Sequence, residues 1–135
     1  MPQRCTIEQI EGSSDKTASA KGTGIAEVIG ADRAVVLVAV TAGSGTVDHF
    51  QVYLEGSNDQ VTWYELPATR TLKSTGTNAP ATVGTNKRNF VEETSVTTSG
   101  LYVGYYEGLP AYVRPAWIID GTGPHETFEI HIYGK

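Results

Sequence analysis

The sequence predicts an all-β domain, an antiparallel β-sandwich of jelly-roll or related Greek-key topology with one long loop. Apolar and polar residues alternate in many short runs, as they do in strands that bury one face. Fifteen glycines and six prolines separate these runs, which is the frequent punctuation that many short strands require. No run shows the period of about 3.6 residues that an amphipathic helix would have.

Length and charge limit the number of domains and the class of partner. Its 135 residues suit one domain with one core. Within that domain we separate an N-terminal strand and arm or loop, residues 1–24, from the β-sandwich of residues 25–135. The net charge of −5, from ten Lys and Arg against fifteen Asp and Glu, argues against a general nucleic-acid binder, because phosphate neutralisation needs clustered cations.

The single cysteine and the N-terminal residues bear on the compartment. Cys5 has no second cysteine with which to form an intramolecular disulfide, and we expect it to be a buried, inert thiol. The first residues lack the apolar run of a signal peptide. No apolar stretch approaches the roughly 20 residues that span a bilayer. We therefore expect a protein that is made in a cytoplasm and is not exported by a visible signal, with no membrane partner.

The first third of the chain predicts three strands and a loop. Residues 4–10 alternate well enough for a first strand. Residues 11–24 are small and polar and predict a long solvated loop, with an arm that grips a neighbour as the alternative. Residues 25–29 predict a short strand closed by Gly30. Residues 34–42 are apolar on both faces, and their β-branched content favours a central strand covered on both sides over a buried helix.

Residues 50–66 predict the β-hairpin around which the other strands are organised. Alternating apolar and polar residues at 50–55 give way to four residues that tolerate turn geometry, 56–59. β-Branched and aromatic residues resume at 61–66, and Pro67 ends them. A glycine-rich turn at 43–46 is expected to join this hairpin to the preceding strand, so that the two strands pair antiparallel.

The second half of the chain predicts one long irregular loop and then further strands. Residues 68–89 are rich in Thr, Asn and Gly, and predict a solvated excursion or, alternatively, a contact loop for a partner. Residues 70–72 could add a short strand inside it. Pro115 suggests an edge position or a bulge. The later strands are expected at residues 90–95, 101–106, 112–119 and 126–133, with a turn at 120–124.

Residues that could carry chemistry do not form a recognisable catalytic pattern. His49 and His125 each neighbour an acid, but adjacent strand residues point to opposite faces. His125 and His131 could share a face with Glu129, a surface pair without zinc-site spacing. No nucleophile-elbow, metalloprotease, P-loop or dinucleotide motif is present. We therefore expect no catalytic residue, no cofactor and no metal.

Two further groups of residues each allow a structural interpretation and a ligand-binding interpretation. Glu55, Asn58 and Asp59 carry oxygens that could bind calcium, but a turn stabilised by Asx hydrogen bonds is favoured. The aromatic pairs Trp63-Tyr64 and Tyr105-Tyr106 each place one ring on either face. One ring of each pair is expected in the core. The other would stabilise the sheet through cross-strand contacts, bind a sugar or anchor a protein.

Two segments resemble a known family. Residues 52–59 followed by Thr62-Trp63-Tyr64 resemble the LEGSND…TWY hairpin of small β-sandwich virion proteins from tailed bacteriophages. Residues 112–117, through Gly121-Thr122-Gly123-Pro124 to 128–130, are similar to the closing strands of that group. The two segments cover well under half of the chain. Related sandwiches also occur in carbohydrate-binding modules.

The resemblance implies a non-enzymatic structural protein of a phage particle. A capsid decoration protein on the outside of the assembled head is favoured, because the chain is short and single-domain. A tail or adsorption component and a carbohydrate-binding module are the alternatives. The implied partner is the major capsid protein or another virion protein, the localisation is the virion, and a homo-oligomer, with a trimer favoured, is expected. The candidate contact residues are Arg70, Lys73, Lys87, Arg88, Tyr53 and Tyr105.

Overall fold

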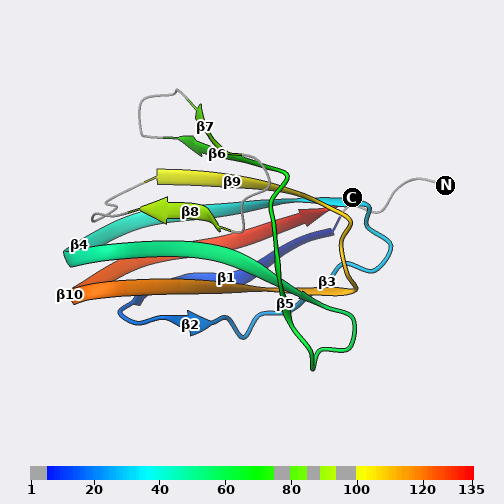
Figure 1. The fold of residues 1–135 in the computed structure, drawn as a ribbon, viewed down its shortest axis with the longest axis horizontal. Coiled ribbons are helices and arrows are strands. Elements are labelled where there is room, and N and C mark those ends of the chain that lie inside the picture. The colour runs from blue at the N-terminus through cyan, green and yellow to red at the C-terminus, as the bar shows by residue number, and fades with distance from the viewer. Residues whose placement is uncertain (1–5, 75–79, 85–88, 94–99) are drawn as a thin grey trace.

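The computed structural model describes residues 6–74, 80–84, 89–93 and 100–135 (Figure 1). These residues form an antiparallel all-β structure, as the sequence predicts. Six strands follow the order β1-β10-β4-β9-β6-β7, while β2 and β3 pair with β10, and β5 and β8 pair with β4. Because every described strand belongs to one hydrogen-bonded sheet, a two-sheet sandwich of jelly-roll or Greek-key topology stays a prediction.

Two strands are far longer than the others. The strand bounds are β1 Thr6–Lys16, β2 Ala20–Lys21, β3 Ala26–Glu27, β4 Arg33–Ser57, β5 Tyr64–Leu66, β6 Arg70–Ser74, β7 Pro80–Gly84, β8 Asn89–Glu93, β9 Gly100–Glu107 and β10 Tyr112–Gly134. The predicted hairpin is confirmed, because β5 pairs antiparallel with the end of β4, from Leu54 opposite Leu66 to Gly56 opposite Tyr64. The strands predicted at 90–95 and 101–106 correspond to β8 and β9.

The pairing of β4 with β10 forms a ribbon that folds the sheet over. The pairs run from Ala34 opposite Gly134 to Ser57 opposite Tyr112. At one end of the molecule both strands bend together and return (Figure 1). The first half of β4 and the second half of β10 form one layer with β1, β9, β6 and β7, which we call the β9 layer. The other halves form the β5 layer with β2, β3, β5 and β8.

The predicted turns at 43–46 and 120–124 are wrong, because both strands continue through those residues. Register shifts between residues 120 and 128 bend the ribbon without ending its pairing. Gly45 has φ 76° and Gly121 has φ 149°. A Cβ on Gly45 would lie 1.9 Å from the carbonyl oxygen of Gly123, and a Cβ on Gly121 would lie 2.0 Å from that of Thr46. Glycine is therefore required where the two strands cross the bend.

The core lies between the two layers. Phe50 and Trp117 come from the β5 layer, and both pack against Phe128 of the β9 layer, with ring centroids 5.5 and 5.4 Å away. The Trp117 ring meets Phe128 edge-on, a favourable geometry for aromatic rings. The aliphatic side chains that complete this core include Val36, Val38, Val40, Val52, Leu54, Val113, Ile119, Ile130 and Ile132.

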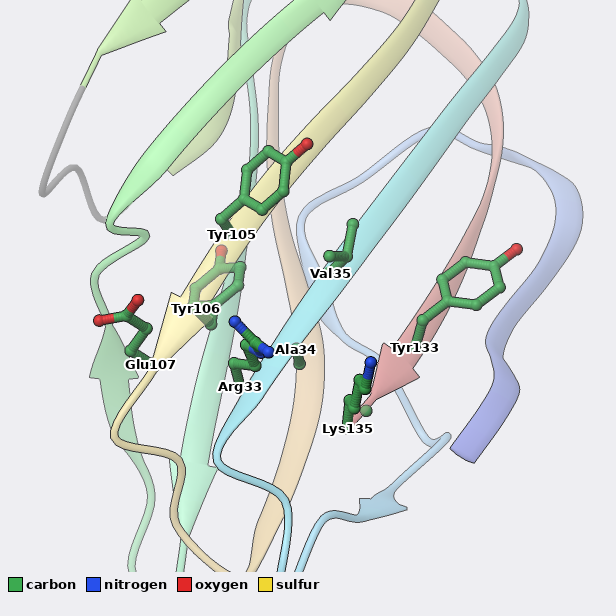
Figure 2. Close-up of a pocket in the computed structure, with 9 residues that line it drawn as sticks. Arg33, Ala34, Val35, Tyr105, Tyr106, Glu107, Tyr133 and Lys135 are labelled. Carbon is green, nitrogen blue, oxygen red and sulfur yellow. The ribbon is translucent and has the colours of Figure 1, made fainter. Parts of the chain in front are cut away.

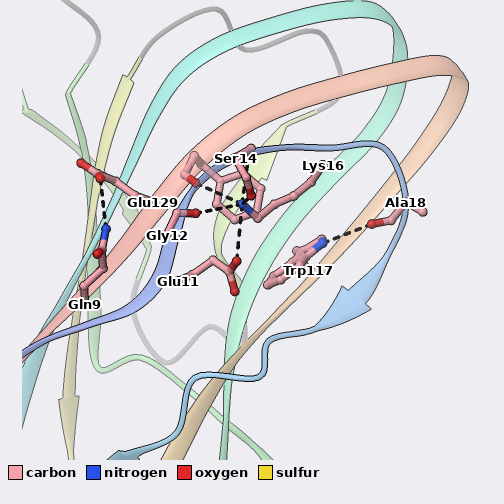
Figure 3. Close-up of polar contacts among 9 residues, drawn as sticks. Gln9, Glu11, Gly12, Ser14, Lys16, Ala18, Trp117 and Glu129 are labelled. Carbon is pink, nitrogen blue, oxygen red and sulfur yellow. Dashed lines mark hydrogen bonds and ion pairs between the residues drawn. The ribbon is translucent and has the colours of Figure 1, made fainter.

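The prediction of a solvated loop over residues 11–24 is wrong for residues 11–16 and 20–21, which form strands, while residues 17–19 and 22–24 lie outside the strands. β1 continues to Lys16 along β10, through two register shifts, and β2 pairs with β10 a few residues later. The Lys16 ammonium lies inside, 4.2 Å from the Phe128 ring centroid. It donates to the carbonyl oxygens of Gly12, Ser14 and Phe128 at 3.1–3.3 Å (Figure 3). Lys16 thereby ties the irregular end of β1 to β10 through backbone carbonyl oxygens of both strands.

Burial changes the pKa of this lysine. Desolvation lowers the pKa of Lys16, and the nearby Glu11 carboxylate, 3.6 Å away, opposes that shift. The neighbouring Trp117 donates its Nε1–H to the carbonyl oxygen of Ala18 at 3.1 Å, as Figure 3 shows. Polar contacts thus hold residues 11–18 against the edge of β10, although their sequence is small and polar.

In the second half of the chain, the structure tests the predictions for residues 68–89 and for Pro115. Residues 68–89 contain the hairpin of β6 and β7, so the prediction of an irregular excursion is wrong for these strands, while the short strand at 70–72 is confirmed. Pro115 pairs opposite Leu54 on β4, and its carbonyl oxygen accepts from the Gly22 N–H on the other side at 2.8 Å. The Pro115 nitrogen, which carries no hydrogen, therefore lies on the side of β10 that only β2 and β3 flank. This position is consistent with the predicted edge position.

The bend gives a testable prediction. Gly45→Ala and Gly121→Ala should each lower the free energy of unfolding by about 1–3 kcal/mol or more, because each adds backbone strain and a close contact. Gly12→Ala is the control, because an added Cβ at Gly12 meets nothing within 4 Å. Chemical denaturation measures all three variants. Equal stability of the Gly121 and Gly12 variants would contradict the role of the bend.

Candidate functional site

The outer face of the β9 layer is apolar and partly exposed. Along β4, Val36 and Val38 point into the core, so Val35 and Leu37 point outwards. Leu37 lies opposite Val103 of β9, which lies opposite Leu72 of β6. The central strand was predicted to be covered on both sides, but in the described part of the chain only its inner side is fully covered. The side chains of this outer face are Val35, Leu37, Ala39, Leu72, Leu101, Val103, Tyr105 and Tyr133.

One end of the outer face is hollowed into a trough with a volume of about 310 Å³. Val35 lies at its centre, between Tyr105 of β9 and Tyr133 of β10, which are its cross-strand partners on either side. Figure 2 shows the two tyrosine rings flanking Val35, with Arg33 and Lys135 together at the end of the strands. Aromatic walls with charged groups at one end are typical of a surface that binds another molecule.

The charged residues at this end are positioned by the backbone. The Lys135 N–H donates to the carbonyl oxygen of Arg33, and the Lys135 carbonyl accepts from the N–H groups of Asp32 and Arg33, at 2.9–3.2 Å. Glu107 also lines the trough and lies opposite Arg33 in the ladder. On the far side of Tyr105, the Arg70 guanidinium lies 5.7 Å from the ring centroid. The trough is therefore bordered by the cations of Arg33 and Lys135 and by the carboxylate of Glu107.

The candidate contact residues fall in different places. Arg70 and Tyr105 lie together on the outer face. Tyr53 is only 6% exposed, so the expectation that it is an exposed tyrosine is wrong; the side chain lies under Lys21, whose ammonium donates to its hydroxyl at 2.7 Å. Lys73 lies in β6 with its side chain outside the described part of the structure. Lys87 and Arg88 lie outside the described residues.

Sequence reasoning missed three trough residues, Arg33, Tyr133 and Lys135. Strand alternation places Tyr133 on the face opposite Ile132, but nothing in the sequence shows that Tyr105 lies on the same surface. The signal that could have found the surface is the outward half of residues 34–42, which is apolar where an exposed strand face would be polar.

A charged cluster covers the outer side of the β5 layer. The Glu55 carboxylate accepts from the Lys21 ammonium and from Arg114 Nε, both at 2.9 Å. The Arg114 guanidinium lies 4.2 Å from the Trp63 ring centroid. Burial acts to raise the pKa of Glu55, but the hydrogen bonds from the two cations outweigh it and lower that pKa. Because its carboxylate is engaged by two cations, Glu55 serves as an ion-pair centre that ties β2 to the β4–β10 ribbon.

The loop between β4 and β5 is locked by side-chain hydrogen bonds. The Asp59 carboxylate accepts from the N–H groups of Val61 and Thr62 at 2.9 and 2.8 Å, and from the Ser57 hydroxyl at 2.9 Å. The Asn58 side-chain oxygen accepts from the Ala111 N–H at 3.0 Å. The predicted Asx-stabilised turn is confirmed. The sequence assigned Val61 to a strand, whereas it lies in this loop and is 81% exposed.

The histidines lie in separate places. His125 Nδ1 is 2.6 Å from Asp15 Oδ2 on an exposed part of the bend. His131 Nε2 is 3.7 Å from Glu129 Oε2, so these two share a face as predicted, while His125 pairs elsewhere. His49 Nε2 lies 2.6 Å from Gln51 Nε2. Within the described residues, no three His, Cys, Asp or Glu side chains converge to hold a metal ion.

The aromatic pairs follow the expectation only in part. Tyr106 is buried and Tyr105 is partly exposed, as predicted, and burial raises the pKa of the Tyr106 hydroxyl. In the other pair neither ring enters the core, because Tyr64 is half exposed and Trp63 lies under Arg114. The described part of the chain contains no helix that is long and apolar enough to cross a membrane.

The Glu55 cluster predicts a pH dependence of stability. The folded protein holds the pKa of Glu55 below its usual value of 4.5, so its stabilising contribution is present above pH 4.5 and is lost as the pH falls through the lowered folded-state pKa. Glu55→Gln should therefore unfold more easily at neutral pH and lose less stability on acidification than the parent chain. Glu27→Gln, at an exposed site in β3, is the control. Identical acid profiles for all three proteins would contradict this assignment.

The locked loop predicts an unusually acidic carboxyl group. The hydrogen bonds from Thr62, Val61 and Ser57 lower the pKa of Asp59 to about 2. A carbon-13 NMR titration should place the Asp59 midpoint near that value, and Ser57→Ala, which removes one donor, should raise it. A midpoint at the ordinary value of 3.8 would show that the loop is not held in this way.

The chain was compared with protein families, with curated sequences and with solved structures. No protein-family model matches the chain, and no curated protein sequence matches it. The fold is similar to that in the crystal structure of the SPBc2 prophage-derived protein YomS, with 11% sequence identity, 96% of this chain and 93% of that chain covered, and a TM-score of 0.46.

Proposed function

We propose that this protein is a non-enzymatic structural protein that binds another protein through the outer face of its β9 layer. The observation that carries the proposal is the central strand, whose side chains are apolar on both sides although the described residues fully cover only the inner side. Leu101 is 42% exposed and lies opposite Ala39 in the same face. Burying such a face against a partner stabilises the complex by about 25 cal/mol for each Å² of apolar surface removed from water.

The arrangement of side chains supports an interface rather than a solvated surface. Leu37 and Val103 occupy its centre, flanked on β10 by His131 and Glu129. Gln9 of β1 donates to the Glu129 carboxylate at 3.3 Å beyond them (Figure 3). An apolar centre beside a polar rim is the usual anatomy of a protein–protein interface.

The partner we propose is the shell of a bacteriophage particle. Residues 52–59 with 62–64, and residues 112–117, 121–124 and 128–130, resemble small β-sandwich virion proteins of tailed phages. This resemblance supports the major capsid protein, or another virion protein, as the occupant of the face. In this role the protein decorates the outside of the assembled head. Binding to the assembled shell and not to dissociated subunits stabilises the shell by mass action, and several copies on one shell add avidity.

The alternatives receive less support. A tail or adsorption component would use the same outer face, and the binding experiment below separates the two locations. A carbohydrate-binding module would need an accessible indole. Trp117 is only 6% exposed, and the Arg114 guanidinium lies 4.2 Å from the Trp63 ring centroid. No specific observation therefore favours a sugar as the ligand.

Co-sedimentation with purified phage heads tests the proposal. The parent chain should pellet with expanded heads, and Leu101→Asp combined with Val103→Asp should lower the affinity by at least about tenfold, because both place a charge in the apolar centre. Ile25→Asp, at an apolar residue of similar exposure, 37%, outside this face, is the matched control. Circular dichroism confirms that each variant folds.

Three outcomes count against this function. If the parent chain fails to bind heads, capsid decoration is excluded. Binding to isolated tails instead would support the adsorption alternative. Unchanged head binding by the double variant would show that the outer face is not the surface used.

A further inference from the structure

The loop between β4 and β5 carries an exposed apolar tip, which we define as residues 58–64. Val61 at its end is 81% exposed, the most exposed large apolar side chain among those described. Tyr64 follows it at the start of β5 and is also exposed. In Figure 1 this loop projects beyond the body of the molecule, below β5. An apolar side chain held out in this way costs hydration free energy unless something covers it.

The tip is rigid, which distinguishes it from an ordinary solvated loop. Gln60 adopts φ 61°, a backbone conformation that few residues other than glycine adopt. Its N–H donates to the Ser57 hydroxyl at 2.9 Å, while Asp59 binds the two N–H groups that follow. The conformation that presents Val61 is therefore fixed before any partner arrives. Fixing it in advance lowers the entropy cost of association.

The trough on the β9 layer complements this tip in shape and polarity. Its volume of about 310 Å³ leaves room for a small branched side chain between the rings of Tyr105 and Tyr133. The two features lie on different layers of the sheet, and the exposure of Val61 shows that the tip does not fill the trough of its own chain.

The charges around the two features are also complementary. The Asp59 carboxylate lies beside Val61 at the tip, whereas Arg33 and Lys135 lie together at the end of the trough (Figure 2). Glu107 also borders the trough, so two cationic side chains and one carboxylate would meet the single carboxylate of Asp59. Attraction between opposite charges of this kind sets orientation and speeds association more than it adds affinity.

We propose that the Val61 tip of one copy of this protein docks in the Tyr105–Val35–Tyr133 trough of a second copy. The contact is head-to-tail, so each copy offers one tip and one trough, and repetition closes into a ring or continues as a filament. The trimer expected from the sequence is one such closed ring. This interface does not depend on the proposed shell binding, because it requires only this chain.

Sedimentation of the isolated chain tests the self-association. The parent protein should form a defined oligomer, and Val61→Asp should raise its dissociation constant at least about tenfold, as a truncated interface anchor does. Ile29→Asp changes an apolar residue that is 62% exposed in the turn before β4 and should leave the mass unchanged. A parent chain that stays monomeric up to about 1 mM, or a Val61 variant that associates like the parent, overturns the proposal.

A charge exchange tests which surfaces meet. Gln60→Lys at the tip should weaken association because it faces Arg33 and Lys135, and Lys135→Glu alone should also weaken it. Combining the two should restore a large part of the lost affinity, which a double-mutant cycle measures as a coupling between the sites. Additive losses would show that tip and trough do not meet.

The two proposals fail separately. A monomer that still binds phage heads would overturn the tip-in-trough interface and leave the shell-binding function intact. A ring that binds no virion component would overturn the shell-binding function and leave the tip-in-trough interface intact. The Val61 and Leu101–Val103 variants assign each surface to its own partner, because the first changes the tip and the second changes the centre of the outer face.

Discussion

The antiparallel ladder between β4 and β10 is the constraint on which the rest of the fold depends. It pairs β4 with β10 from Ala34 opposite Gly134 to Ser57 opposite Tyr112. Of the other described strands, β1, β2, β3, β5, β8 and β9 pair directly with one of its two strands, and β6 and β7 follow through β9. The bend in this ladder brings Phe50 and Trp117 onto Phe128, so core formation and strand pairing are a single event. Glycine at positions 45 and 121 permits the bend, because a side chain there would meet the opposing backbone.

Charged side chains reinforce the ladder where hydrogen bonding between strands is irregular. Lys16 occupies the inner end of β1 and donates to backbone carbonyl oxygens of β1 and β10. Glu55 joins Lys21 and Arg114 across three strands on the other layer. Both sites bury charge, which is costly unless each group is fully engaged by partners. The short strand β2 therefore stays on the ribbon although it contributes only two paired residues.

The functional proposals follow from surfaces that the described residues form and leave partly exposed. The outer face of the β9 layer presents apolar side chains from several strands, and the tip presents Val61 on a locked loop. A structural protein that is added to a larger assembly needs such preformed surfaces, because ordering them on contact would reduce affinity. Self-association through the tip and the trough would leave the centre of the outer face, around Leu37 and Val103, available for the shell. A ring of copies that bind together would hold a shell more firmly than single copies.

Local patterns in the sequence determined the strand class, most strand positions and the Asx-stabilised turn at Asp59, because alternation and turn chemistry depend on neighbouring residues. Only the tertiary structure decided that residues 43–46 and 120–124 continue the strands: the same glycines suit a turn or a bend, and the choice depends on the partner strand. It likewise placed Lys16 inside, buried Tyr53, and gathered Arg33, Tyr105, Tyr133 and Lys135 into one trough. Those residues come from three strands distant in the chain, and no local pattern encodes which outward-facing side chains become neighbours.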